Sequence, residues 1–503
     1  MKPSSWLETL ELDVNMRPKS FSLAAVVALL LIVGDIVPAT AQPTPGMLET
    51  VDSVFVSQAG DTVAAQYGFL WVRENRSEGN DRMIRLGFVR FPSMSNDPGP
   101  PIVYLAGGPG SSGIDAARGS RFPLFMALRE VGDVIALAQR GTRGSIPYLT
   151  CPDPWVYPLE QALTRETFLQ TTLDWARICA DYWRGLGIDL AAYNTVENAD
   201  DVEALRQALG AEQVSLLGIS YGTHLALSVI RRHPAGVYRA VLAGVEGPDQ
   251  TLKLPSSIQK VLVRVDSLVR ADTTASARYP DFLGSVTAVL DSLERAAVTV
   301  EGLHPSTGEP IPVTIGKFDI QWLTAGSIGN SQILSQLPSI YERLDAGDYA
   351  SIAPFVASSR LRSMLAMTFA MDCASGAPAE RQDRIRREAE ETLLGDAVDF
   401  PHPYICDAWP HAAPDEAFWA PVRSGIPVQF ISGTLDGRTP ASNVDEVRQG
   451  FRNSGQLLLE GAAHSDDLLL SSRRIPEIIL SFLRGGPTVD ETAVVPFRIF
   501  VPE

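Results

Sequence analysis

The sequence is short of positive charge, and this shortage argues against two classes of partner. Its 503 residues include 42 Lys and Arg against 59 Asp and Glu, a formal net charge of −17 at pH 7. An acidic surface repels nucleic acid and anionic membranes, so neither is expected as a partner. With 45% hydrophobic residues the chain can build an ample core. Its length allows one large domain with an insertion, or two to three domains.

Cysteine is also scarce, since the chain has only Cys151, Cys179, Cys373 and Cys406, with no Cys-x-x-Cys pair. The lack of such a pair argues against a redox motif or a zinc ribbon. Four cysteines permit three pairings, of which proximity along the chain favours Cys151–Cys179 and Cys373–Cys406. Four buried free thiols are the alternative. Disulfides form in oxidising compartments, so the two pairings depend on export.

Long hydrophobic runs are missing except near the N-terminus. Arg17 and Lys19 precede an uncharged, mostly apolar run of 14 residues over 21–34, and Ala39-Thr40-Ala41 offers a small-x-small cleavage site. That run is too short to span a bilayer comfortably, so we interpret residues 1–41 as an export signal, with a short membrane anchor as the alternative. Residues before Met16 are acidic, unlike the start of such a signal, and translation is expected to begin at Met16. The mature chain is therefore expected to be periplasmic or secreted, without membrane contact after cleavage.

Short apolar runs recur along the chain and predict a sheet. Runs that are apolar on both faces and bounded by turns are typical of parallel strands covered by helices on each side. They are Ile102–Ala106, Val134–Ala138, Val214–Leu217, Tyr238–Ala243, Val428–Ile431 and Leu457–Leu459. Helical segments at 198–210 and 220–232 separate the earlier runs, whereas residues 42–97 have the pattern of short antiparallel strands. This alternation predicts an α/β fold with a mostly parallel, doubly wound sheet.

The alternation of strands and helices is interrupted over residues 247–425. The stretch is mostly helical in pattern, and at roughly 180 residues it is too long for a connection between two core strands. We therefore interpret it as an inserted helical cap. The core is then expected in two parts, 42–246 and 426–503, and the tail from Gly485 has no informative pattern.

The pentapeptide Gly218-Ile219-Ser220-Tyr221-Gly222 joins a predicted strand to a predicted helix. Gly-x-Ser-x-Gly in that context is typical of a nucleophile elbow, a turn so sharp that the serine hydroxyl stands above the edge of the sheet. Glycine on both sides lets strand and helix approach without side-chain clashes. The pattern alone also arises by chance, so Ser220 needs an acid, a base and an oxyanion hole in the right order.

His464 is the candidate base, because of the six histidines it alone follows the last core strand. Asp436 is the candidate acid, since it lies in the loop after the preceding strand, 28 residues earlier. The order serine, acid, histidine is the one found in hydrolases with a nucleophile elbow. Asp466 and Asp467 are the rivals, but they lie too close to His464 along the chain to approach its ring from behind.

The segment Gly107-Gly108-Pro109-Gly110 directly follows a predicted strand and is the candidate oxyanion loop. An oxyanion hole needs backbone N–H groups aimed where negative charge develops. The amide of Gly108 and that of Tyr221, the residue after the nucleophile, are the expected donors. A phosphate-binding glycine loop is the alternative, but the segment lacks both a following Lys-Ser/Thr and the G-x-G-x-x-G spacing.

These parts, in this order, resemble the prolyl aminopeptidase and tripeptidyl aminopeptidase family of α/β-hydrolases. The resemblance runs from about Tyr67 to Arg484. It is carried by Gly107–Gly110, Gln139-Arg140-Gly141-Thr142, Gly218–Thr223, Asp436 with Thr439-Pro440, and His464. The two cysteine pairs also look like those of the exported tripeptidyl branch. Ala106, Ala138 and Ser465 depart from residues that are common in the family, and none of these departures removes a catalytic group.

The resemblance implies an α/β-hydrolase fold and a serine exopeptidase that needs no cofactor and acts on the free N-terminus of a peptide substrate. Such enzymes hold the substrate ammonium with acidic groups, and Glu246, just past a core strand, lies where the family often places one. Glu246 could equally be a charge at a helix N-terminus. Two alternatives remain. A carboxylester hydrolase (esterase or lipase) of the same fold needs no ammonium site, and a non-catalytic binding module would normally have lost one of Ser220, Asp436 and His464.

Overall fold

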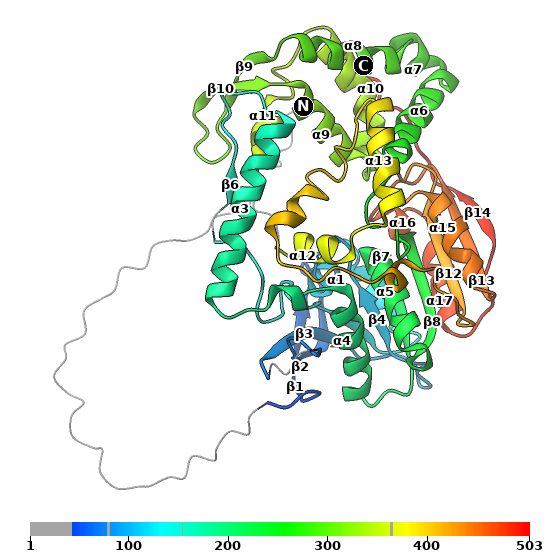
Figure 1. Cartoon of the computed structure of the whole chain (residues 1–503). Coiled ribbons are helices and arrows are strands. Elements are labelled where there is room, and N and C mark those ends of the chain that lie inside the picture. Colours follow the sequence, from blue (N-terminus) through cyan, green and yellow to red (C-terminus); the bar gives the residue numbers. More distant parts are fainter. Residues whose placement is uncertain (1–42, 78–80, 153, 363–365, 503) are drawn as a thin grey trace, which may run out of the picture. The chain divides into compact units, whose positions relative to one another are not determined.

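A ten-stranded sheet runs through the computed structural model, which describes residues 43–77, 81–152, 154–362 and 366–502 (Figure 1). The predicted export signal over residues 1–41 lies outside the described residues. The strand order is β1-β2-β3-β5-β4-β7-β8-β12-β13-β14. The strands are β1 (Leu48–Val56), β2 (Thr62–Arg73), β3 (Met83–Phe91), β4 (Ile102–Leu105), β5 (Val134–Leu137), β7 (Val214–Ser220), β8 (Val237–Val245), β12 (Val428–Gly433), β13 (Ser454–Glu460) and β14 (Glu491–Val494).

The sheet changes from antiparallel to parallel at β5, as the sequence predicts. Strands β1, β2, β3 and β5 pair antiparallel, and every later pair, from β5·β4 to β13·β14, is parallel. Because the carboxyl ends of parallel strands meet at one edge, the loops after β4, β7, β8, β12 and β13 are brought together there.

Both faces of the parallel part are buried, which explains its continuous apolar runs. In β4, Val103 and Leu105 belong to one hydrophobic cluster, and Ile102 and Tyr104 belong to a second cluster on the opposite face. Successive side chains of a strand point to opposite faces, so an apolar residue at every position requires helices on both sides.

Helices supply those two layers. Residues of α4 (Thr195–Ala208), α5 (Tyr221–Arg232) and α15 (Ala441–Val447) join the first cluster. Residues of α1 (Gly113–Arg118), α2 (Phe122–Leu128), α16 (Asp467–Leu470) and α17 (Arg474–Leu483) join the second. The expected doubly wound α/β architecture is confirmed.

The described residues of the region 247–425 are largely helical. The helices are α6 (Pro255–Ala271), α7 (Thr273–Arg278), α8 (Phe282–Arg295), α9 (Lys317–Ser327), α10 (Ser331–Asp345), α11 (Ala353–Arg360), α12 (Ala366–Ser375), α13 (Ala379–Glu391), the 3-10 helix η3 (Tyr404–Ala408) and α14 (Glu416–Trp419). Between α8 and α9 lies an antiparallel hairpin of β9 (Val298–Leu303) and β10 (Pro310–Ile315). The helical pattern does not predict this hairpin, and the domain boundaries themselves stay a prediction.

A segment that precedes the elbow also packs with the cap. The short strand β6 (Trp155–Val156) pairs with β11 (Leu361–Arg362), and α3 (Arg165–Gly185) follows it. Fully buried Arg360, in the cap, joins the cap to this segment. Its guanidinium forms a salt bridge of 2.8 Å with Asp319 of the cap and donates to the carbonyls of Pro158 and Gln161. Residues 155–185 therefore contact the cap, although the sequence places them within the first part of the core.

The tail contributes one more strand. The sequence after Gly485 has no informative pattern, yet β14 pairs in parallel with β13 at the edge of the sheet. Among the helices of the described ranges, none combines the length and apolar character needed to cross a membrane.

Candidate active site

Ser220 lies at the turn between β7 and α5, in a backbone conformation that few residues adopt. Its φ is 54° and its ψ is −128°. The turn depends on its two glycines, since a Cβ on Gly222 would lie 2.0 Å from the Leu105 carbonyl oxygen, and one on Gly218 would lie 2.5 Å from that of Gly222. A non-glycine residue with positive φ, held by close backbone packing, is the geometry that a nucleophile elbow requires.

Asp436 and His464 meet at the same edge of the sheet, in the loops after β12 and β13. His464 Nδ1 donates to Asp436 Oδ2 at 2.7 Å. Thr439 Oγ1 donates to the same oxygen at 2.7 Å, while the amides of Arg438 and Thr439 donate to Oδ1, both at 2.9 Å. Both side chains are buried. Four hydrogen bonds therefore fix the Asp436 carboxylate next to the His464 imidazole.

The electrostatic environment keeps Asp436 ionised. Burial alone raises the pKa of this carboxyl, but the charge of His464 and the hydrogen bonds from His464 and Thr439 outweigh burial and lower the pKa below its usual value. An ionised Asp436 accepts the Nδ1 proton of His464, which leaves Nε2 as the nitrogen able to take a proton. Ser220 and His464 line one cavity, although no hydrogen bond joins them in the described part of the chain.

The glycine loop after β4 lies against the elbow. A Cβ on Gly107 would lie 2.8 Å from the Ile219 carbonyl oxygen and 2.9 Å from Ser220 Cβ, so only glycine allows this approach. Gln139 Nε2 donates to the Ala106 carbonyl at 3.0 Å and supports the loop from below. Gly107, Gly108 and Gly110 line the cavity together with Ser220. The amides of Gly108 and Tyr221 remain the predicted oxyanion donors.

Arg140, the neighbour of Gln139, has a structural position. Its guanidinium is fully buried and forms a 2.8 Å salt bridge with Asp201, a 3.3 Å one with Glu197, and hydrogen bonds to the carbonyls of Glu74 and Ala192. A buried cation with this many acceptors ties β2 and α4 to the loop after β5. The Gln-Arg-Gly motif therefore supports the oxyanion loop from outside the cavity.

The cavity that contains Ser220 has a volume of about 740 Å³. Its walls come from the loops of the core and from Gly326, Gly329 and Asn330 of the cap. Residues of the core and of the region 247–425 therefore both shape the cavity. Five charged residues line it, namely Asp115, Arg121, Arg143, Arg438 and Asp466.

Glu246 lies just past β8, as expected, but its side chain is buried and engaged. Lys253 Nζ forms a 2.7 Å salt bridge with Glu246 Oε2, while Oε1 has no hydrogen-bond partner among the described residues. Glu246 is not one of the described residues that line the cavity. Its role in holding a substrate ammonium stays a prediction.

Two further carboxylates share this lysine. Burial raises the pKa of Asp399 to about 6 and that of Asp372 well above its usual value, and in both cases the charge of Lys253 is the largest opposing influence. The backbone amide of Lys253 donates to Asp399 Oδ2. Sequence reasoning missed Lys253, Asp372 and Asp399, because they lie in the cap and no local motif marks them.

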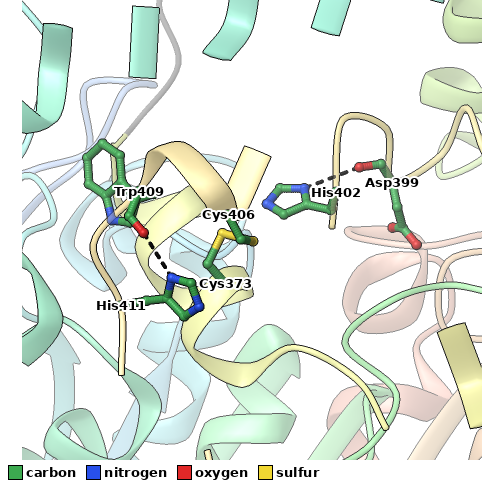
Figure 2. The surroundings of a disulfide bond; sticks show 6 residues. All are labelled: Cys373, Asp399, His402, Cys406, Trp409 and His411. Carbon is green, nitrogen blue, oxygen red and sulfur yellow. Dashed lines mark hydrogen bonds between the residues drawn. A yellow bond between two sulfur atoms is a disulfide. The ribbon is translucent and has the colours of Figure 1, made fainter. Parts of the chain in front are cut away.

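All four cysteines are paired as proximity along the chain suggests. Cys151 bonds to Cys179, which ties a loop of the core to α3, and Cys373 bonds to Cys406, which ties α12 to η3. Figure 2 shows the second disulfide with His402 nearby, hydrogen-bonded through Nδ1 to the Asp399 carbonyl at 3.2 Å. Burial lowers the pKa of His402 to about 4, so the imidazole is neutral. The three potential metal ligands Cys373, His402 and Cys406 lie together, but metals bind the thiolate form of cysteine, and both sulfurs are in the disulfide.

Comparison with known proteins agrees with this geometry. Residues 100–282 match the alpha/beta hydrolase fold family, and residues 396–493 match the TAP-like protein family. The chain therefore has the α/β-hydrolase fold. Its C-terminal part is similar to TAP-like proteins.

The relatives are modestly similar. The serine protease Hip1 of Mycobacterium tuberculosis is 31% identical over 187 residues, which is 35% of this chain and 34% of Hip1. The tripeptidyl aminopeptidase of Streptomyces coelicolor is 26% identical over 202 residues, 37% of this chain and 36% of that protein. The chain thus matches about a third of the length of these relatives. A solved structure of a meta-cleavage product hydrolase from Pseudomonas fluorescens is 12% identical, with a TM-score of 0.36 over 79% of this chain and 94% of the other.

Proposed function

We propose that this protein is an exported serine exopeptidase, an aminopeptidase that hydrolyses peptides from the free N-terminus through Ser220, His464 and Asp436. The observation that carries the proposal is the 2.7 Å hydrogen bond between His464 Nδ1 and Asp436 Oδ2. His464 lines the same cavity as Ser220, whose φ is 54°. Similarity to the serine protease Hip1 and to the tripeptidyl aminopeptidase of Streptomyces coelicolor supports a peptide substrate.

The proposed reaction is acyl transfer in two halves. His464 Nε2 takes the proton of Ser220 Oγ as this oxygen attacks the scissile carbonyl, and Asp436 stabilises the imidazolium that forms. The amides of Gly108 and Tyr221 bind the oxyanion. The C–N bond then breaks as His464 gives its proton to the leaving amine. Water, activated by His464, releases the acyl group and restores Ser220.

The proposed ammonium site centres on Glu246. Three carboxylates, those of Glu246, Asp372 and Asp399, act on the charge of one lysine, Lys253. The cluster gains an excess of negative charge once the pH exceeds the raised pKa of Asp399, about 6. Burial is the main cause that raises the pKa of Tyr221, and the charges of Asp372 and Glu246 add to it. Their negative potential therefore reaches the buried phenol of Tyr221, the residue next to Ser220, and would favour a cation on that side of the nucleophile.

The carboxylester hydrolase remains the second candidate, and one observation favours it. Glu246 already has an ammonium partner in Lys253, and an ester needs no site for a charged amine. A non-catalytic binding module has no comparable support, since the Asp436–His464 pair is intact.

The deciding experiment compares free peptides, N-acetylated peptides and short-chain esters as substrates of the purified protein. Cleavage restricted to free N-termini is the expected result, and Ser220→Ala should abolish it. Glu246→Gln should lower kcat/KM for free peptides and leave short esters unaffected. Equal turnover of blocked peptides would overturn the requirement for a free N-terminus. Turnover of esters alone would overturn the aminopeptidase and leave the esterase.

Export is proposed on the two disulfides and the apolar run over residues 21–34. A bacterial host that expresses the full chain should deliver an active, disulfide-bonded protein outside the cytoplasm, shorter by the residues up to Ala41. A chain that begins at Gln42 should stay in the cytoplasm. Retention of the full chain there with its N-terminus intact would contradict export.

A further inference from the structure

The three arginines that line the catalytic cavity differ in their partners. Arg121 Nε forms a 2.7 Å salt bridge with Asp466, and Arg143 forms a 3.4 Å one with Asp115. Arg438 has no salt bridge to any of the described residues. Its one side-chain hydrogen bond there is to the Gly326 carbonyl, at a long 3.3 Å. The guanidinium of Arg438 therefore keeps most of its five donors available to the cavity.

The position of Arg438 is tied to the catalytic residues. Its backbone amide donates to Asp436 Oδ1 at 2.9 Å. Its side chain reaches the cap so closely that a Cβ on Gly329 would lie 3.2 Å from Arg438 Nε and 3.4 Å from His464 Cβ. The guanidinium is thus half-buried between the catalytic loop and the beginning of α10. The N-terminus of α10 carries partial positive charge and does not neutralise the arginine, while the Gly326 carbonyl in the last turn of α9 supplies only the partial negative charge of a helix C-terminus.

Asp399, a carboxylate on which the charge of Arg438 acts, is already engaged. Arg438 contributes to lowering the pKa of Asp399, but less than Lys253 does, and the Lys253 amide donates to that carboxylate. In a chain with 59 acidic residues, this half-buried arginine in the wall of the cavity that holds Ser220 has no salt-bridge partner in the described part of the chain. A planar guanidinium in a partly desolvated wall binds a carboxylate strongly and with defined geometry.

We propose that Arg438 forms a carboxylate-binding subsite of the catalytic cavity, so that substrates with a carboxylate near the scissile bond are preferred. The inference builds on the proposed acyl transfer at Ser220, but it does not require the substrate to be a peptide. The carboxylate has two possible sources, an acidic side chain of the substrate and the free C-terminus of a short peptide. Both present the same group to the guanidinium.

The test uses matched substrates that differ by one carboxylate. One set of peptides has Glu or Gln on either side of the cut, and a second set has a free or an amidated C-terminus. A third pair consists of the p-nitrophenyl monoester of succinic acid and the neutral butyrate ester. The wild type should show a kcat/KM about tenfold to a hundredfold higher for the carboxylate member of at least one pair. The set that shows the preference identifies the source.

Variants assign the preference to Arg438. Arg438→Gln should bring the ratio between the paired substrates close to one, mainly through KM, and Arg438→Lys should restore part of it. Arg143→Gln, which removes an arginine of the same cavity that already has an acidic partner, should keep the wild-type ratio. Labelling of Ser220 by a fluorophosphonate reports that each variant is folded with a reactive serine.

Two outcomes would overturn the subsite. They are the absence of a carboxylate preference in every pair, and a preference that survives in Arg438→Gln while the variant still labels. Failure of the aminopeptidase proposal looks different, since the peptide sets would then be inert and the ester pair would still report on Arg438.

Discussion

Two buried carboxylates, Asp436 and Glu246, follow the neighbouring strands β12 and β8, yet their surroundings differ. Asp436 accepts four hydrogen bonds from its own loop and from His464. Glu246 has one salt bridge, to Lys253, and an oxygen without a partner in the described residues. A carboxylate with all its acceptor positions occupied, such as Asp436, holds its partner His464 in one orientation. A carboxylate with a spare acceptor can still bind another cation, and this difference separates an orienting role from a binding role.

The same contrast extends to the groups around them. The pKa of Asp436 is lowered although it is buried, whereas burial raises the pKa of Asp372 and Asp399. The local hydrogen bonds of a loop can thus outweigh desolvation, but a single lysine shared among three carboxylates does not. The electrostatic balance around Lys253 is therefore less favourable than that around Asp436.

The largest expected effect on activity comes from replacing Asp436, whose carboxylate accepts four hydrogen bonds. Asp436→Asn should lower kcat by about 10⁴-fold on any substrate, because an amide in this position favours the wrong tautomer of His464. Steady-state kinetics on a neutral ester measures the loss, and thermal unfolding checks that the variant is folded. A loss of less than about tenfold would mean that Asp436 does not orient the base.

The next effect concerns the shared lysine. Lys253→Met should destabilise the protein by about 3 kcal/mol, because it leaves buried carboxylates without their main opposing charge. Glu246→Gln should cost only about 1 kcal/mol, since Lys253 keeps Asp399 and Asp372 near it. Urea unfolding of both variants provides the comparison. A Glu246→Gln variant that is the less stable of the two would show that the pair, not the cluster, holds this region together.

The smallest effect is on pH dependence, where Asp399 and Asp436 should act with opposite signs. The folded pKa of Asp399 is raised from 3.8 to about 6, so its contribution is fully present below pH 3.8 and is lost as pH rises through about 6. The slope from this one group cannot exceed about 1.4 kcal/mol per pH unit. The folded pKa of Asp436 is lowered, so its contribution is present above pH 3.8 and is lost as pH falls further.

Urea unfolding between pH 3 and 7 tests the opposite signs. Asp399→Asn should make stability rise more steeply, or fall less, between pH 4 and 6 than in the wild type. Asp436→Asn should alter the profile only below about pH 4. Identical profiles of stability against pH for the wild type and Asp399→Asn would mean that another group of the cluster has the raised pKa.

Much of the core and of the candidate site could be predicted from the sequence, because the signals are local. The elbow needs Gly218 and Gly222 within one turn of Ser220, and the expected strands are apolar on both faces. The order of residues along the chain predicts Asp436 and His464, because neighbouring parallel strands end at the same edge of the sheet. The hairpin β9–β10, the short edge strand β14 and the packing of α3 on the cap have no comparable local pattern.

By itself, the sequence determined the elbow, the order of the candidate catalytic residues and the layers of the sheet, because each depends on residues close in the chain or on strand periodicity. Only the tertiary structure decided which charges share a site. Lys253 meets Asp399 across 146 residues, and Arg438 reaches Gly326 across 112. The first contact forms when the cap folds on itself and the second when the cap packs on the core. Burial and the available partners at these contacts then decide which carboxylate or guanidinium is left without a partner.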